Sequence, residues 1–277
     1  MRRFLFITLC LFSFYSLSAS FTKGQPPAEG ERKAGDRMVV KIKDVEYPFR
    51  WCPPGTFVMG SPVGEASRNN NERQHEVTLT RGFWLLETEV TQLMWESVMG
   101  NNPSRFKGEK RPVEQVTWHD SQEYVEKLNT LLADTSGVPA GFKVSLPTEA
   151  QWEYACRSGT ATTYYFGDTL SKEQANFAGS VGQTTDVGSY PANAWGLRDM
   201  HGNVWEWCLD WWGDYPENAV TDPTGVSQGT DRVDRGGSWY NDAWASRSAL
   251  RGNFDPAETN ALLGLRIALV SGKDEKP

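Results

Sequence analysis

The histidines of this 277-residue chain are the first candidates for acid–base or metal chemistry, and their spacing argues against both. His75, His119 and His201 lie far apart and form neither an HxxxH nor an HExxH pattern, so no zinc hydrolase site is indicated. A hydrolase built on Ser238 lacks the nucleophile-elbow sequence. Glu206 is a single carboxylate among aromatic residues, where a structural role is favoured over that of a general acid.

The thiols offer no zinc site either. Cys10 lies in the N-terminal apolar run, and the cysteines after it, Cys52, Cys156 and Cys208, form no CxxC pair. Their odd number is compatible with one disulfide and one free thiol, although the spacing does not select the pair. It is equally compatible with small buried hydrophobic residues, above all at Cys156 and Cys208.

Residues 1–20 are predicted to be a cleaved signal peptide. Two arginines precede an apolar run over residues 4–17, and small residues follow it. The run is too short to span a bilayer, which takes about 20 apolar residues. We therefore expect an exported protein (periplasmic, secreted or cell-surface) without a transmembrane segment in the mature chain. It should comprise a flexible tether over 21–37, a single domain over 38–271 and a polar tail over 272–277.

Composition narrows the partners and the fold. A formal net charge of −7 argues against a nucleic-acid partner, because such proteins usually carry a basic excess. The 12 tryptophans and 26 glycines favour packed loops and short strands over long amphipathic helices. Apolar alternation predicts strands within 38–61, 75–91 and 264–270. Helices are predicted within 116–132 and 146–159, the second opened by a Thr148/Gln151 capping box.

Six motifs then follow one another in a fixed order: "PPGTFVMGSP", "ETEVTQ", "RPVEQVTW", "LPTEAQWEYACRSGT", "YPANAWGLRDMHGNVWEWCLDWW" and "RVDRGGSW…RSALRGNFDP…GLRIAL". Together they closely resemble the formylglycine-generating-enzyme (sulfatase-modifying factor) family, over about Val40 to Val270. The resemblance implies an α+β, C-type-lectin-like fold. It would have little regular secondary structure and two main helices against a small twisted antiparallel sheet.

The resemblance also shows what is missing. Family members that oxidise a substrate cysteine hold Cu(I) with two cysteine thiolates, the soft ligands that this soft ion selects. The corresponding positions here are Ala243 and Ser248, and no cysteine follows Cys208. A methyl group cannot bind copper, and a serine hydroxyl is a hard, weak ligand. The copper-dependent oxidase chemistry is therefore expected to be absent, and no catalytic residue is assigned.

A structural Ca²⁺ site is implied by the same resemblance, in the segment "DMHGNVWE". Its oxygen ligands would be the side chains of Asp199 and Glu206 and the backbone carbonyls of Gly202 and Val204. The alternative is that the two carboxylates only accept hydrogen bonds from loop amides. A second family site, beginning near Asn176, lacks an evident acidic ligand and is not predicted.

The last segment combines framework residues with residues that the framework does not explain. We expect Trp239 to plug the core, and Arg247 and Arg251 to pair with buried carboxylates or carbonyls. The other residues have the mixture of aromatic and small polar side chains that antibody loops use, so a ligand-binding surface is predicted, with a plain variable loop as the alternative. Its members are Tyr240, Asn241, Asp242, Trp244, Ser246, Ser248, Leu250, Gly252, Asn253, Phe254 and Asp255. Those expected to be at least partly exposed and close together are Tyr240, Asp242, Trp244, Ser248 and Phe254.

This arrangement is similar to the variable proteins of diversity-generating retroelements, among them a treponemal one. Those proteins place diversified residues on a fixed lectin-type scaffold. The resemblance implies a non-catalytic, receptor-like protein that binds an unidentified protein or cell-surface ligand. The alternative is an enzyme of the formylglycine-generating-enzyme family with an active centre that does not use copper.

Overall fold

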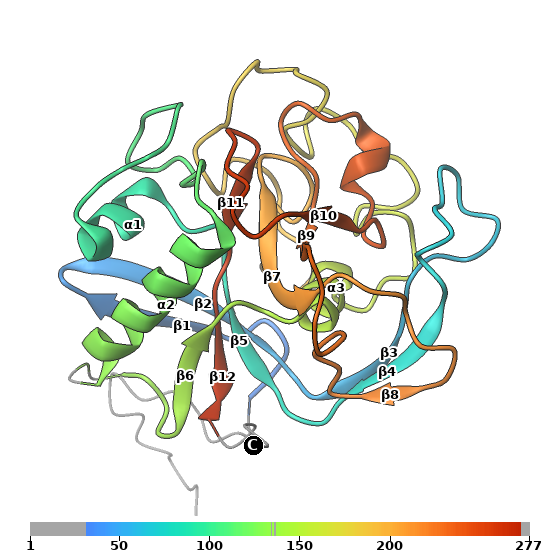
Figure 1. Cartoon of the computed structure of the whole chain (residues 1–277), viewed down its shortest axis with the longest axis horizontal. Helices are drawn as coiled ribbons and strands as arrows, with labels where there is room; N and C mark the ends of the chain where they lie inside the picture. Colours follow the sequence, from blue (N-terminus) through green and yellow to red (C-terminus); the bar gives the residue numbers. More distant parts are fainter. Residues whose placement is uncertain (1–31, 134, 136, 273–277) are drawn as a thin grey trace, which may run out of the picture.

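Three α-helices and three sheets make up the described part of the chain, residues 32–133, 135 and 137–272, in a computed structural model (Figure 1). The predicted signal peptide, residues 21–31 of the predicted tether and residues 273–277 of the predicted tail lie outside the described residues. The rest of the predicted tether belongs to the fold. Gly35 donates its N–H to the Trp51 carbonyl, and Trp51 donates its own to Asp36. The expected start at residue 38 is therefore too late.

The largest sheet is antiparallel and has the order β1-β2-β5-β12-β6. Its strands are β1 (Arg37–Ile42), β2 (Val45–Cys52), β5 (Phe83–Leu86), β12 (Ala268–Ser271) and β6 (Phe142–Ser145). Strand β1 shows why such segments form strands, because every second residue, Met38, Val40 and Ile42, is buried. One face of this strand thereby covers the core.

The two smaller sheets carry the remaining strands. One has the order β10-β9-β7-β11, with β7 (Trp205–Trp211), β9 (Arg232–Arg235), β10 (Gly252–Phe254) and β11 (Leu263–Leu265). The other has the order β3-β4-β8, with β3 (Gly55–Met59), β4 (His75–Leu79) and β8 (Val220–Thr221). The pairs β7/β11 and β4/β8 are parallel, so the sheet structure is not antiparallel throughout.

The predicted closing strand over 264–270 is wrong in one respect, because it divides into β11 and β12, which belong to different sheets. Arg266 lies between them and is fully buried. Its guanidinium donates to Glu206 of β7 and to the Leu86 carbonyl of β5. This side chain therefore links the two sheets at the point where the chain crosses from one to the other.

Both predicted helices are present, as α2 (Trp118–Leu132) and α3 (Glu149–Arg157), and the Thr148/Gln151 capping box is confirmed. A third helix, α1 (Gln92–Met99), was not predicted. Thr91 caps it by accepting the Met94 N–H, but Met94 occupies the position where a capping box has Glu or Gln. The described residues also include the 3₁₀ turn η2 (Ala243–Ser246). No helix of the described residues is long and apolar enough to cross a membrane.

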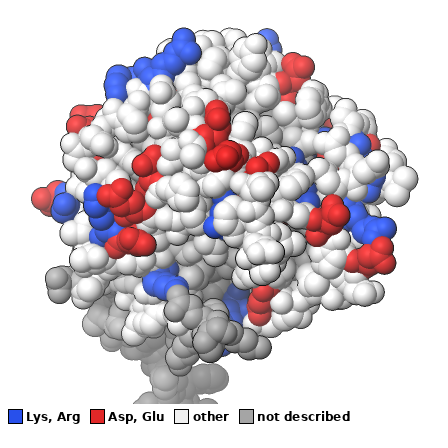
Figure 2. Space-filling model, in the orientation of Figure 1, with Lys and Arg blue, Asp and Glu red and all other residues white. Residues whose placement is uncertain are grey.

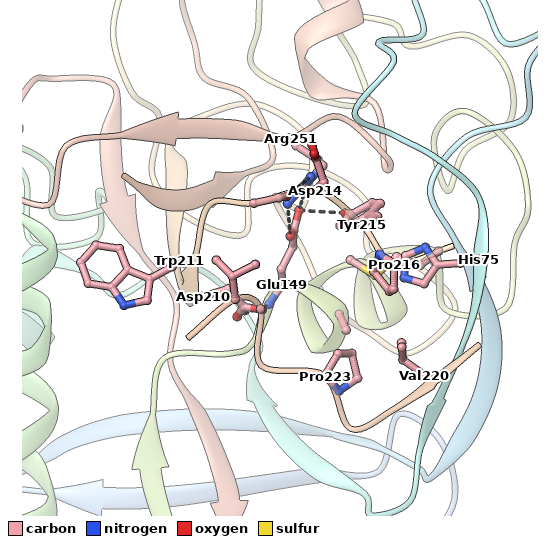
Figure 3. Close-up of a pocket in the computed structure, with 15 residues that line it drawn as sticks. His75, Glu149, Asp210, Trp211, Asp214, Tyr215, Pro216, Val220, Pro223 and Arg251 are labelled. Atoms are coloured by element: carbon pink, nitrogen blue, oxygen red, sulfur yellow. Dashed lines mark hydrogen bonds and ion pairs between the residues drawn. The ribbon is translucent and has the colours of Figure 1, made fainter. Parts of the chain in front are cut away.

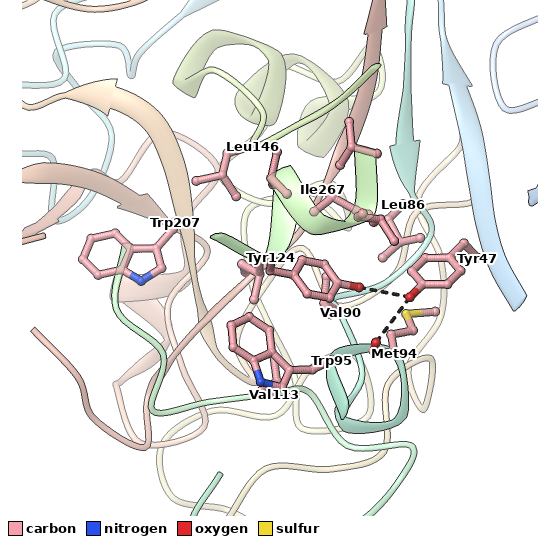
Figure 4. Packing of buried hydrophobic residues seen from close by; sticks show 14 of the residues in the cluster. Tyr47, Leu86, Val90, Met94, Trp95, Val113, Tyr124, Leu146, Trp207 and Ile267 are labelled. Carbon is pink, nitrogen blue, oxygen red and sulfur yellow. Dashed lines mark hydrogen bonds between the residues drawn. The ribbon is translucent and has the colours of Figure 1, made fainter. Parts of the chain in front are cut away.

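Aromatic side chains fill the core between α1, α2 and the largest sheet (Figure 4). Tyr124 stacks on Trp95 with ring centroids 5.1 Å apart, and its hydroxyl donates to that of Tyr47 at 3.2 Å. A second apolar cluster surrounds α3 and contains the three cysteines of the described chain. All three are free and buried, so the disulfide alternative is wrong and the hydrophobic one is confirmed.

Charged side chains are distributed in small groups on the face shown in Figure 2, with acidic and basic residues interspersed among uncharged ones. That face carries no continuous basic tract of the kind that follows a nucleic-acid backbone.

Candidate functional site

The last segment enters the site through a double-glycine turn. Gly236 and Gly237 follow β9 with φ values of +99° and +76°, a conformation that favours glycine. A Cβ atom on Gly237 would lie 2.4 Å from Ser246 Oγ of η2. Glycine is therefore required here both by the backbone conformation and by the close approach of η2.

Arg247 holds the segment in place through buried ion pairs. It is 1% exposed, and its guanidinium contacts Glu65 at 2.6 Å and Glu72 at 2.6 Å and 2.9 Å. It also donates to the Ser67 carbonyl at 2.8 Å. The expected pairing of Arg247 with buried carboxylates is thereby confirmed, and the partners come from the loop between β3 and β4.

Arg251 makes the second anchor, on α3. Its Nε and Nη2 atoms donate to the two oxygens of Glu149 at 2.7 Å and 2.8 Å, the two-pronged geometry that favours Arg over Lys. Its guanidinium also lies 3.8 Å from the centre of the Tyr215 ring. Burial alone would raise the pKa of Glu149, but Arg251 and Arg235 outweigh it and hold that pKa below its ordinary value. The charged form of the pair is thus the stable one.

Three residues at and just before η2 face the solvent without such anchors, and we call them the aromatic patch: Tyr240, Asp242 and Trp244. Tyr240 is 65% exposed and Trp244 is 48% exposed, so both indole and phenol rings are available for contact. Asp242 is also exposed. Asn241 between them is half-buried, and its Oδ1 accepts from Trp205 Nε1 at 2.9 Å and lies against Ser238 Oγ. Asn241 therefore supports the patch from inside.

The expected exposure of Ser248 is wrong, because this residue is buried. Ser246 and Leu250, two other predicted members of the binding surface, are buried as well. The carbonyl of Ser246 accepts from His201, and Leu250 packs in the core. The 3₁₀ turn and the turn that follows it, closed by the Leu250 N–H on the Arg247 carbonyl, bring these residues to the inner side of the segment. Trp239, which is expected to plug the core, is only half-buried. Its indole N–H donates to the Ala261 carbonyl.

The remaining predicted binding residues lie on or beside β10, an edge strand of its sheet. Asn253 and Asp255 are exposed there, and Phe254 is half-buried, with its ring 6.4 Å from that of Trp207. Gly252 cannot carry a side chain, because a Cβ would lie 2.2 Å from Asp234 Oδ2. Position 252 is therefore restricted by the buried acid beneath it.

The two positions that the resemblance assigns to copper-binding cysteines, Ala243 and Ser248, both contact the surrounding chain. The Ala243 carbonyl accepts from the Tyr164 hydroxyl at 2.8 Å. Ser248 Oγ lies 3.8 Å from the thiol of Cys156. Burial raises the pKa of Cys156 to about 12, so this neighbouring thiol stays protonated at neutral pH.

His201 does not form a hydrolytic pair with Ser238. Its Nε2 accepts the Tyr165 N–H at 3.1 Å, and its Nδ1 donates to the Ser246 carbonyl at 2.7 Å. Burial lowers the pKa of His201 to about 3, so the ring is neutral and both nitrogens serve the backbone.

The carboxylates predicted to bind calcium have different surroundings. Asp199 accepts the Gly188 N–H through Oδ2, while its buried Oδ1 has no hydrogen-bond partner, which fits a cation ligand. Glu206 does not fit as arranged. Both of its oxygens accept from Arg266, and Oε2 also accepts from Trp152 Nε1 at 2.6 Å. The described residues contain no group of three or more His, Cys, Asp or Glu side chains placed to hold a metal ion.

One neighbour of the aromatic patch was not predicted. Ala178 donates its N–H to the Asn241 carbonyl, and Gly179 donates to the Trp239 carbonyl. Val181 of the same loop is 47% exposed. No sequence pattern indicated this contact, because it joins segments that are about 60 residues apart through backbone atoms alone.

Comparison with known proteins identifies a family and several relatives of this chain. The family model described as the sulfatase-modifying factor enzyme 1-like domain matches residues 48–270. The serine/threonine-protein kinase pkn1 of Chlamydia caviae is 40% identical over 164 residues, which are 57% of this chain and 24% of that protein. This chain thus spans about a quarter of that relative's length. The formylglycine-generating enzyme of Mus musculus is 30% identical over 213 residues, 70% of this chain and 53% of that enzyme.

Two solved structures are similar over nearly their whole length. Treponema denticola variable protein 1 aligns with a TM-score of 0.75 and 28% identity, covering 84% of this chain and 98% of that one. PvdO from Pseudomonas aeruginosa aligns with a TM-score of 0.73 and 28% identity, covering 86% and 99%. The resemblance carried by the six motifs is confirmed, and the chain belongs to the sulfatase-modifying factor 1-like family, which includes the formylglycine-generating enzymes.

Proposed function

We propose that this chain is a non-catalytic, exported member of its family that binds a protein or cell-surface ligand through the aromatic patch. The observation that carries the proposal is the contrast within one short segment. Tyr240 and Trp244 are the exposed large aromatic residues of this segment, and the residues beside them are clamped by buried ion pairs. A rigid support lowers the conformational entropy lost on binding.

The residue types at the family's copper positions support the absence of thiol oxidation. Ala243 offers no ligand atom, and Ser248 is buried beside a protonated thiol. Two thiolates cannot assemble there from the described residues. The alternative, an enzyme with another active centre, has support in the relatives that are named formylglycine-generating enzymes.

We further propose that the patch is diversified by a retroelement, as in the variable proteins noted above. The likeness to Treponema denticola variable protein 1 supports this idea. Gly252, which lies outside the patch, is not expected to be diversified, because a Cβ there would displace the buried carboxylate of Asp234. A reverse transcriptase gene nearby, with a near-copy of the 3′ coding repeat, would be expected; sequencing of the locus tests this directly.

Export rests on the predicted signal peptide. The mature protein should begin near residue 21, which intact-mass measurement of protein recovered from the envelope or the medium can check. A mature chain that still contains residues 1–20 would contradict the proposal.

The binding role is tested by comparing wild type with the Tyr240→Ala/Asp242→Asn/Trp244→Ala triple variant. Cell-surface proteins captured by each are identified by mass spectrometry, and the affinity of a purified candidate is then measured. A partner bound by the wild type should lose affinity at least tenfold with the triple variant, since a few central aromatic residues dominate most interfaces. A partner bound equally by both proteins places the binding surface elsewhere and contradicts the proposal.

A further inference from the structure

A cavity of about 320 Å³ lies between the start of α3 and the chain around β8 (Figure 3). None of its lining residues belongs to the aromatic patch. Its rim includes the exposed residues Asp214 and Val226, and its floor includes Met59 and Asp210, which are 2% and 3% exposed. This is the size of a site for a small molecule.

The walls of the cavity are apolar. Met59, Ala150 and Val220 contribute side chains from β3, α3 and β8, and Val226 closes one side at the rim. Figure 3 shows the Trp211 indole pointing away from the other lining residues, so this residue contributes little of its ring. An alkyl group would therefore find a complementary surface here.

Most charges at the floor are already paired. Glu149 accepts two hydrogen bonds from Arg251 and one from the Tyr215 hydroxyl. His75 Nδ1 lies 3.1 Å from the Arg73 carbonyl. Asp210 is different, because no ion pair among the described residues includes it. Its Oδ2 accepts the Glu149 backbone N–H at 2.8 Å.

We propose that this cavity binds a small primary alkylamine, with its ammonium group on the Asp210 carboxylate and its alkyl chain against Met59 and Val220. Asp214 at the rim would add a second negative charge along the entry path. A ligand carboxylate would be repelled by the same groups, and a neutral alcohol would leave the buried charge of Asp210 uncompensated. This site is independent of the proposed surface function.

Binding should depend on pH, because burial and the charge of Glu149 raise the pKa of Asp210 to about 7. An ammonium group requires the ionised carboxylate. Affinity should therefore be about tenfold higher at pH 8 than at pH 6, the ratio of the ionised fractions for a pKa near 7. The charged or titratable groups that face Asp210 or share the cavity are Glu149, Arg251, Arg232, Cys208, His75, Asp214 and Tyr215.

The test is a titration of the full chain with n-butylammonium, followed by NMR or calorimetry, with n-butanol and pentanoate as comparison ligands. We expect saturable binding of the amine alone, with the pH dependence given above. Asp210→Asn should weaken it at least tenfold while keeping an oxygen acceptor for the Glu149 N–H. Glu123→Gln, at an exposed carboxylate of α2, should leave it unchanged. His75→Gln should retain the pH dependence, which assigns that dependence to Asp210.

The pH dependence of amine binding is measured on the wild-type protein, so it tests the proposal even if Asp210→Asn is poorly folded. No saturable binding of the amine, equal binding of n-butanol, or an affinity that is the same at pH 6 and pH 8 would each overturn the proposal.

Discussion

Trp244 and Arg247 are three residues apart and share a hydrogen bond, yet they belong to different regions of the molecule. Arg247 donates its Nε hydrogen to the Trp244 carbonyl at 3.1 Å, but it is 1% exposed whereas Trp244 is 48% exposed. The inner region consists of charged side chains with fixed partners. The outer region consists of side chains that contact little of their own protein.

The two regions therefore differ in which substitutions the fold tolerates. A buried guanidinium with three carboxylate contacts cannot be replaced without leaving charges unpaired, whereas an exposed ring can be changed at little cost to folding. A surface of this kind can vary in sequence while its support stays constant. Stability measurements on variants of each region test this difference.

The largest effect is expected from Arg247→Met, which leaves Glu65 and Glu72 buried without their partner. The free energy of unfolding should fall by about 3–5 kcal/mol, the range for breaking a buried ion pair. Urea unfolding monitored by tryptophan fluorescence measures it. The matched control is Arg73→Met, which removes an exposed pair with Glu217 and should leave the unfolding curve unchanged. Equal effects of the two substitutions would show that burial of the pair is irrelevant.

Calcium should stabilise the folded protein by binding at Asp199, a buried carboxylate outside the Arg247 ion pairs. If Ca²⁺ binds Asp199, its addition to chelator-treated protein should raise the melting temperature. The stabilisation is about 2.7 kcal/mol at a hundredfold excess over Kd. Asp199→Asn should remove this response, while Asp242→Asn on the patch should retain it. A wild-type melting curve that is identical in calcium and in chelator would leave Asp199 and Glu206 with hydrogen-bonding roles only.

Stability should also fall as pH rises from 5 to 7. Burial raises the pKa of Asp199 to about 6 and that of Asp210 to about 7, and it also raises those of Glu89 and Asp234, so the folded protein binds protons that the unfolded chain releases. His201 offsets one of these protons below its ordinary pKa, because burial lowers the pKa of its folded form to about 3. The stabilisation is complete below the ordinary aspartate pKa and is lost as pH rises through the raised values, by up to about 1.4 kcal/mol per pH unit and group. Urea unfolding at several pH values tests this, and Asp210→Asn should flatten the slope. A free energy of unfolding that increases between pH 5 and 7 would contradict the assignment.

The smallest effect is expected in the outer region. Each substitution of the Tyr240→Ala/Asp242→Asn/Trp244→Ala variant should change the free energy of unfolding by no more than about 0.5 kcal/mol. Trp152→Ala, in the core, is the reference and should cost about 3–5 kcal/mol. Thermal melts of both variants measure this. If the triple variant unfolds as readily as the core variant, the patch is part of the packed structure and not a free surface.

The sequence predicted elements whose signals are local. The cap of α3 follows from Thr148 and Gln151, three residues apart, and the burial of Arg247 and Arg251 follows from their place in the motif. Helix α1 was missed because it has eight residues and lacks the second half of a capping box.

Long-range partners were beyond such reasoning. Glu72 lies 175 residues before Arg247, and no local pattern marks it as the partner. Residue type alone places Ser248 and Leu250 at the surface, whereas the 3₁₀ turn before them determines which side faces inward. In an irregular segment, the local backbone direction determines whether a side chain points inward or outward. The periodicity of helices and strands does not predict that direction.

We propose that this member of the family has the family's fold but lacks the copper chemistry. The most direct test is to incubate the purified chain with Cu(I), oxygen and a cysteine-containing sulfatase-type peptide, and to follow the peptide mass. We predict no conversion of cysteine to formylglycine, with or without copper. Copper-dependent conversion that is lost when Cys52, Cys156 or Cys208 is replaced by serine would contradict the account and establish the chain as an enzyme.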